Sequence, residues 1–135
     1  MKVTQDSVYS AVHSFQSLRT IIFLAEHNRQ KLWGADIGSA YLEAKNPEKC
    51  VCVAGDEFGD ALKGHLLIID KALYGVPGCG KAFAEHLGVR LRAEGFTPSL
   101  ADPCIWMRPA GDVYEYVATW VDDLCIVMNL SLIHI

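Results

Sequence analysis

The chain has 135 residues, of which 51% are hydrophobic and 21% are charged. This length fits one domain or part of a larger protein, and the composition argues against a disordered tail. Twelve basic and sixteen acidic residues give a net charge of −4, which excludes a basic nucleic-acid-binding arm but not an acidic, metal-binding nucleic-acid enzyme. No apolar stretch reaches the roughly 18 residues of a membrane helix and no signal-peptide pattern is present, so we expect an intracellular protein without a membrane partner.

Apolar residues at three- and four-residue steps predict an amphipathic helix over residues 7–27. Asp6 and Ser7 are its N-cap candidates. Polar residues 28–31 end it. Further elements expected before the glycine-rich break at 75–80 are a strand over 31–37 that ends near Asp36, a helical turn over 38–42, a loop at Asn46-Pro47, and strands over 50–54 and 66–69.

The second half begins with a predicted helix over residues 81–94, which Gly95 ends as a C-cap. Strands are then expected over 105–108, 113–121 and 124–128. Asp122 and Asp123 separate the last two strands, so we predict a β-hairpin with both carboxylates at its tip. The predicted fold class is α/β (α+β), with a mostly antiparallel sheet and both helices packed on one face.

Asp122 and Asp123 carry the strongest chemical signal in the sequence. Adjacent like charges repel each other, and a divalent cation that prefers oxygen ligands, such as Mg²⁺, relieves the repulsion. A solvent-exposed acidic turn is the plain alternative, because Asp is a good turn former. Asp36 ends another predicted strand, and if these strands are neighbours, three carboxylates meet at one edge of the sheet. Such a cluster can hold two metal ions for in-line phosphoryl displacement.

Four blocks in a fixed order carry a resemblance to a known family. They are WGADIGSAYL at 33–42, KALYG at 71–75, ADPCIW at 101–106 and WVDDL at 120–124. Together they resemble the reverse transcriptase of copia-type long-terminal-repeat retrotransposons, over roughly residues 5–129. The resemblance implies a partial polymerase palm and an RNA-directed DNA polymerase activity.

The resemblance also implies a role for each carboxylate. Asp36, Asp122 and Asp123 are expected to be the catalytic residues and to bind two Mg²⁺ ions, for which Mn²⁺ can substitute. A primer 3′-hydroxyl attacks the α-phosphate of a deoxynucleoside triphosphate, and pyrophosphate leaves.

The nucleotide contacts are likewise implied by the family. Tyr41 matches the aromatic residue that excludes a ribose 2′-hydroxyl, although an ordinary core aromatic remains the alternative. Gly75 and Gly78 are expected under the templating base or the nucleotide. The backbone amides expected to face the triphosphate belong to Ile37, Gly38, Ser39, Ala40 and Tyr41.

One residue and one four-residue block depart from the family pattern. Trp120 stands where the usual box has Tyr, and residues 78–81 read Gly-Cys-Gly-Lys where many members have Gln-Ala-Pro-Arg. The domain expected is a partial fingers and palm domain over 1–129, and residues 130–135 read as a non-native, adapter-like tail. The family implies as partners an RNA template, a DNA primer and deoxynucleotides, integrase and RNase H in the same polyprotein, and a cytoplasmic virus-like particle.

Two other interpretations stay open from the sequence. The chain can be an inactive relic fragment, in which the carboxylates have no catalytic role. Alternatively, residues 75–81 fit the spacing of a P-loop, but Ala82 stands where Ser or Thr must offer a hydroxyl to Mg²⁺. The cysteines lack zinc-site spacing and are expected to be buried free thiols; they are Cys50, Cys52, Cys79, Cys104 and Cys125.

Overall fold

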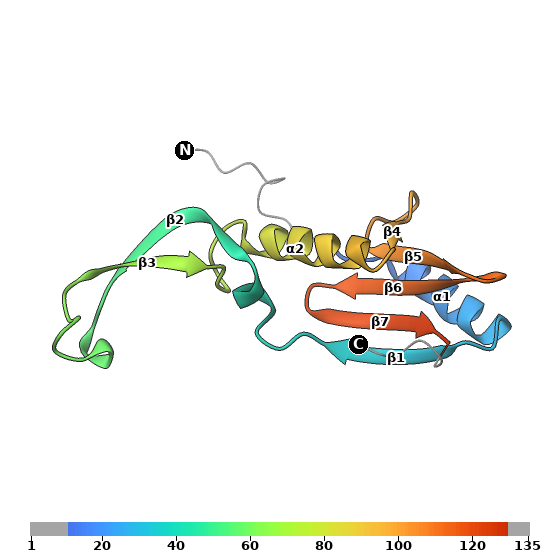
Figure 1. The fold of residues 1–135 in the computed structure, drawn as a ribbon, viewed down its shortest axis with the longest axis horizontal. Coiled ribbons are helices and arrows are strands. Elements are labelled where there is room, and N and C mark those ends of the chain that lie inside the picture. The colour runs from blue at the N-terminus through green and yellow to red at the C-terminus, as the bar shows by residue number, and fades with distance from the viewer. Residues whose placement is uncertain (1–10, 130–135) are drawn as a thin grey trace. The chain divides into compact units, whose positions relative to one another are not determined.

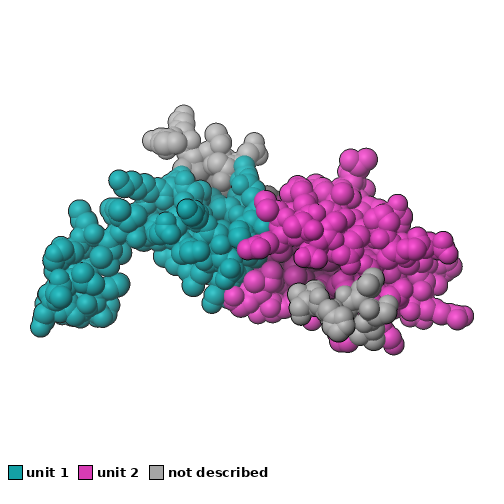
Figure 2. All heavy atoms as spheres, viewed as in Figure 1, with its two compact units in different colours: residues 1–9, 39–86 teal, residues 10–38, 87–135 magenta. Residues whose placement is uncertain are grey.

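The computed structural model describes residues 11–129, which form two compact units. Residues 11–38 and 87–129 hold a five-stranded sheet, and we call them the sheet unit. Residues 39–86 hold a two-stranded sheet, and we call them the ribbon unit. Figure 2 shows the two units in different colours.

The sheet unit has antiparallel strands in the order β1-β7-β6-β5-β4 (Figure 1). Two-residue loops, at 111–112 and 121–122, join β5 to β6 and β6 to β7, as is typical of β-hairpins. The strand bounds are β1 (Lys31–Asp36), β4 (Thr97–Pro98), β5 (Ile105–Ala110), β6 (Val113–Trp120) and β7 (Asp123–Met128). The predicted strands are therefore present, and the antiparallel α+β class is confirmed.

Two hydrophobic clusters cover opposite faces of this sheet. The first joins helix α1 (Phe15–His27) to the strands and comprises Ile21, Ala25, Ile105, Ala118 and Val127. The second comprises Phe96, Trp106, Val117 and Met128, with Leu91 of helix α2 (Cys79–Ala93) packed against it. Ile105 and Trp106 are consecutive in β5, and consecutive strand residues point to opposite faces. The prediction that both helices pack on one face is therefore wrong.

Helix α1 begins later than the predicted residue 7. Ser14 is its N-cap, and the Ser14 hydroxyl accepts a hydrogen bond from the Ser17 amide at 3.0 Å. Val12 instead forms an antiparallel bridge with Trp120 of β6. The apolar pattern before Ser14 thus serves the sheet and not the helix. The predicted caps Asp6 and Ser7 lie outside the described residues.

The predicted helix over 81–94 is α2, with its start two residues earlier, and Gly95 follows it with φ 83°. This positive φ is the conformation that a glycine after a helix end adopts without strain.

The ribbon unit contains β2 (Lys45–Val53) paired with β3 (Leu66–Lys71), and two 3₁₀ turns at Ala40–Glu43 and Asp56–Phe58. The predicted loop at Asn46-Pro47 lies inside β2, where the register shifts between Lys45 and Cys50. The loop prediction is wrong because an irregular edge strand tolerates proline.

Candidate active site

Two of the predicted catalytic carboxylates face each other across a pair of strands. Asp36 ends β1, Asp123 begins β7, and the two are direct partners in the antiparallel register. The amide of Ile37 donates to the carbonyl of Asp122 at 3.0 Å. Position 37/122 is therefore hydrogen-bonded, and the neighbouring Asp36/Asp123 pair is non-hydrogen-bonded, with Cβ atoms about 4.5–5.5 Å apart. Both aspartates are exposed.

The third carboxylate, Asp122, lies in the hairpin loop. The loop comprises Val121 and Asp122, so it begins one residue earlier than predicted, and Asp123 belongs to β7. Val121 adopts φ 55°. A β-branched residue is strained in this left-handed region, and such strain concentrates at functional sites. The hairpin itself is confirmed, with its tip displaced by one residue.

Asp36 and Asp123 place like charges opposite each other. Like charges directly opposite in a sheet destabilise it, and carboxylate oxygens are the ligands that Mg²⁺ prefers. Within residues 11–129, no group of three or more His, Cys, Asp or Glu side chains is close enough together to hold a metal ion. The structure thus brings Asp36 opposite Asp123 and places Asp122 beside them in sequence, without a closed three-carboxylate cluster.

The residues after Asp36 form a tight turn that continues into the ribbon unit. Ile37 is half-buried, Gly38 is exposed, and Ser39 takes φ 55° before the 3₁₀ turn that starts at Ala40. Ala40 is fully buried, so this turn is anchored in the ribbon unit.

The ring of Tyr41 is held by two other aromatic rings of the ribbon unit. It stacks on Tyr74 with ring centroids 3.9 Å apart and an interplanar angle of 11°. The Phe83 ring packs against the Tyr41 ring at a tilt, with centroids 5.9 Å apart. These contacts are favourable packing and fix the direction of the ring.

Gly75 and Gly78 both take positive φ, at 88° and 79°. No heavy atom lies within 4 Å of where a Cβ on Gly75 would be. Glycine is therefore favoured at this position by the positive φ and not by a lack of space. The adjoining β3 pairs with β2 in an antiparallel ribbon. A P-loop instead follows a strand of a parallel sheet, so the P-loop alternative is not supported.

The sequence family described as reverse transcriptase (RNA-dependent DNA polymerase) matches residues 2–134. The chain belongs to this reverse transcriptase family. A curated relative is the "Retrovirus-related Pol polyprotein from transposon TNT 1-94" of Nicotiana tabacum, which is 24% identical over 124 residues. That alignment covers 90% of this chain and 9% of the polyprotein, so the chain spans about a tenth of its relative's length. No solved structure matches the chain significantly. The predicted retrotransposon reverse transcriptase fragment is thereby confirmed.

The cysteines of this reverse transcriptase chain are all free thiols. Burial, together with the charge of Asp102, raises the pKa of Cys104, and burial raises the pKa of Cys125, so both thiols stay protonated at neutral pH. The expectation of buried thiols is confirmed for Cys79 and Cys104. Cys50 and Cys125 are half-buried, and the expectation is wrong for Cys52, which is exposed.

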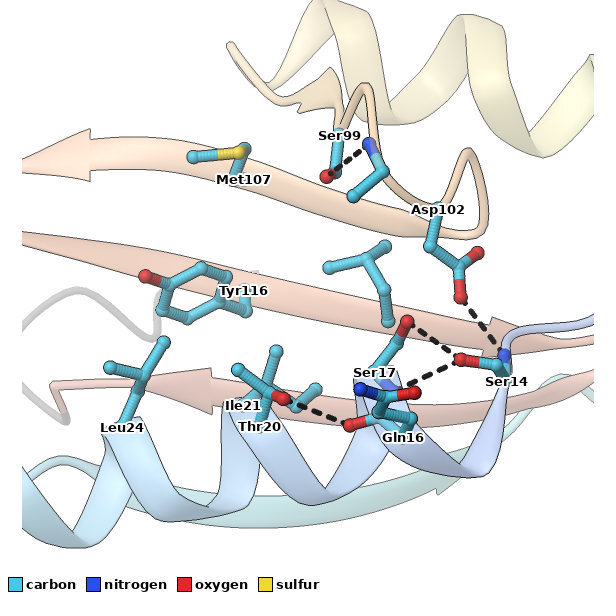
Figure 3. Close-up of a pocket in the computed structure, with 12 residues that line it drawn as sticks. Ser14, Gln16, Ser17, Thr20, Ile21, Leu24, Ser99, Asp102, Met107 and Tyr116 are labelled. Carbon is cyan, nitrogen blue, oxygen red and sulfur yellow. Dashed lines mark hydrogen bonds between the residues drawn. The ribbon is translucent and has the colours of Figure 1, made fainter.

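Among residues 11–129, neither helix combines the length and the apolar character needed to cross a bilayer. A groove also lies along α1, and none of the three predicted catalytic aspartates lines it (Figure 3).

Sequence reasoning missed two buried acids of the sheet unit, Asp102 and Glu115. Asp102 belongs to the block ADPCIW, whose residues have no role assigned from the sequence. Glu115 is fully buried in the middle of β6, and its signal is a single acid in an otherwise uncharged strand.

Proposed function

We propose that this chain carries the catalytic carboxylates of an RNA-directed DNA polymerase of a copia-type retrotransposon. The observation that supports it most is the register of Asp36 against Asp123 at the end of the hairpin that contains Asp122. Two opposed carboxylates with a third beside them supply the oxygen donors that divalent cations prefer. In this proposal Asp36, Asp122 and Asp123 hold two Mg²⁺ ions, or Mn²⁺ in their place.

The chemistry is nucleotidyl transfer. The primer 3′-hydroxyl gives its proton to solvent water and its oxygen bonds to the α-phosphorus of the incoming deoxynucleotide. The bond from the α-phosphorus to the oxygen that bridges to the β-phosphate breaks, and pyrophosphate leaves with the electron pair. When bound, the metal ions lower the pKa of the hydroxyl and stabilise the leaving group. The chain's own part is to hold the carboxylates on paired strands, and Val121 sets the turn that carries Asp122.

In this proposal residues 37–41 and two glycines of the ribbon unit contact the nucleotide. Tyr41, stacked on Tyr74, excludes the 2′-hydroxyl of a ribonucleotide by its volume. The backbone amides of residues 37–41 face the triphosphate. Gly75 and Gly78 let the chain approach the templating base or the nucleotide closely.

The whole polymerase has further partners under this proposal. The template is RNA, the primer is DNA, and base pairing selects the sequence that is copied. The relative's description as a Pol polyprotein is consistent with further domains in the same polypeptide. In this proposal those domains are integrase and RNase H, and the location is a cytoplasmic virus-like particle.

Primer extension tests the proposal. The chain is expressed alone and within the longest open reading frame that encodes it, and each is assayed on a primed RNA template with deoxynucleotides and Mg²⁺. Asp122→Asn lowers extension by about 10³-fold or more, as expected for a catalytic residue. Asp112→Asn, in the loop at the other end of β6, leaves extension unchanged. Extension by Asp122→Asn at the wild-type rate overturns the catalytic assignment.

The role of Tyr41 has its own matched pair of variants. Tyr41→Ala removes the ring and raises ribonucleotide incorporation by about tenfold or more, whereas Tyr41→Phe keeps the ring and the discrimination. Equal discrimination in the alanine variant and the wild type refutes the steric exclusion.

A catalytically silent chain is the second candidate. It is favoured by one observation, the lack of a closed cluster of three metal-ligating side chains among the described residues. Under this candidate, neither polypeptide extends a primer and Mn²⁺ does not bind at Asp36.

A further inference from the structure

Asp102 is a buried carboxylate outside the carboxylate pair, and it binds two backbone amides. It lies in the turn before β5 and is 9% exposed. One oxygen, Oδ2, accepts from the amide of Ser14 at 2.9 Å (Figure 3), and Oδ1 accepts from the amide of Cys104 at 3.1 Å. Burial opposes ionisation of Asp102, but hydrogen bonds from Ser17, Ser14 and Cys104 outweigh it and lower its pKa. The ionised acceptor makes both bonds strong.

The two amides that Asp102 binds belong to segments that contact the C-terminal end of β6, just before the loop that contains Asp122. The carbonyl of Cys104 accepts from the Thr119 amide at 2.9 Å and from its hydroxyl at 3.3 Å. On the other side of Ser14, Val12 bridges Trp120, and the His13 ring meets the Trp120 ring edge-on with centroids 5.3 Å apart. Thr119 and Trp120 are the last two residues of β6.

This strand end needs support from outside the hairpin. Strand β5 pairs with β6 only as far as Ile105 with Ala118, so Cys104 and Val12 take over the pairing beyond that point. The loop that follows contains a strained Val121, and the next strand begins with Asp123 opposite Asp36. Both features oppose the observed geometry.

We propose that Asp102 is a positioning residue for the carboxylate hairpin. Its two bonds fix Ser14 and Cys104, and through Val12 and Thr119 they hold Trp120 in the register that sets Asp123 opposite Asp36. The inference rests on the proposed metal site for its consequence in catalysis, whereas the positioning itself is measurable without a metal.

Two substitutions at Ser14 isolate the bond to Asp102. Ser14 has φ −76°, which suits proline. Ser14→Pro and Ser14→Ala both remove the capping hydroxyl, but only proline removes the amide hydrogen that Asp102 binds. Mn²⁺ affinity of the full 135-residue chain, measured by water-proton relaxation, is expected to be about tenfold weaker or more in Ser14→Pro than in Ser14→Ala, the size of one hydrogen bond to a charged group.

Asp102→Asn is the reciprocal variant, because it keeps the shape of the side chain but turns one acceptor into a donor. Its matched control is Phe96→Leu, which loosens the cluster on the other face of the sheet without touching this network. Asp102→Asn weakens Mn²⁺ binding as Ser14→Pro does, whereas Phe96→Leu binds Mn²⁺ as the wild type does.

Hydrogen exchange supplies a readout that needs no metal. The amides of Thr119 and Ile37, whose bonds lie on either side of the hairpin, exchange faster in Ser14→Pro than in Ser14→Ala. The Ala54 amide in the ribbon unit keeps its rate. If the wild type does not bind Mn²⁺, the proposed metal site fails for this chain, and faster exchange alone still supports the positioning role. Equal exchange rates in the two Ser14 variants overturn it, as does equal Mn²⁺ affinity in a chain whose wild type binds the ion.

Discussion

The two ends of strand β6 carry loops of the same length with different residues. Both loops have two residues, and in both the first residue takes positive φ, 65° at Gly111 and 55° at Val121. Glycine adopts this conformation without strain, whereas valine does not.

The charged register partners near the two ends of β6 also differ. Towards the Gly111 loop, Arg108 and the fully buried Glu115 are register partners and form an ion pair at 2.6 Å. At the Val121 loop, the register partners Asp36 and Asp123 have like charges. One end of β6 therefore combines an unstrained turn with paired opposite charges, and the other end carries strain and repulsion of the kind found at functional sites.

We expect the greatest loss of stability from breaking the Arg108–Glu115 ion pair, near the Gly111 end of β6. Glu115→Ala lowers the free energy of unfolding by about 3 kcal/mol, because it leaves the partly buried Arg108 guanidinium without its carboxylate. Urea unfolding of the 135-residue chain measures this loss. Lys63→Ala, which breaks the exposed ion pair with Asp56, is the control and costs less than about 0.5 kcal/mol. Equal losses in the two variants contradict the comparison.

Moving the strained residue to the relaxed loop has the next largest effect. Gly111→Val lowers the free energy of unfolding by about 1–2 kcal/mol, the cost of a left-handed conformation for a residue with a Cβ. No heavy atom lies within 4 Å of the new Cβ, so the cost is conformational and not steric. An unchanged midpoint in urea shows that positive φ is not costly in this loop.

The reverse change at the other loop has a smaller effect of opposite sign. Val121→Gly raises the free energy of unfolding by about 0.5 kcal/mol, because the strain relieved slightly exceeds the greater backbone entropy of unfolded glycine. A loss of stability in the same urea experiment means that packing of the Val121 side chain outweighs its strain, and the contrast between the loops then fails.

The smallest expected effect is on pH dependence, through Asp102. Its folded-state pKa lies below the ordinary value of 3.8, so its contribution to stability is complete above that pH and disappears as the pH falls through the lowered pKa. The difference in unfolding free energy between wild type and Asp102→Asn is measured from about pH 6 to below the lowered pKa of Asp102. It is expected to shrink only as the pH falls below 3.8. A difference that is constant over this range contradicts an ionised Asp102.

The sequence predicted the elements that carry the carboxylates, because strand ends and hairpins are local features. Asp36 at a strand end and the hairpin around Asp122 follow from apolar runs and turn residues. The predicted loop position is wrong by one residue, because Asp is a better turn former than Val and no local sequence feature indicates that Val121 adopts positive φ.

Long-range contacts account for what the sequence did not predict. Val12 fits the period of helix α1, but it pairs with Trp120, far along the chain. Asp102 lies in a segment whose residues are typical of a turn. Its hydrogen bond joins it to Ser14, 88 positions away in the sequence. The placement of the two helices on opposite faces likewise depends on which strand residues meet them, which periodicity alone does not specify.

Mn²⁺ binding by the 135-residue chain is the direct test of a metal site at Asp36 and Asp123. Asp36→Asn is compared with Asp112→Asn, which lies in the loop at the opposite end of β6. We expect the wild type and Asp112→Asn to bind Mn²⁺ equally, and Asp36→Asn to bind it about tenfold more weakly or worse. Equal affinity in all three proteins would contradict a metal site at the strained, like-charged end of the strand.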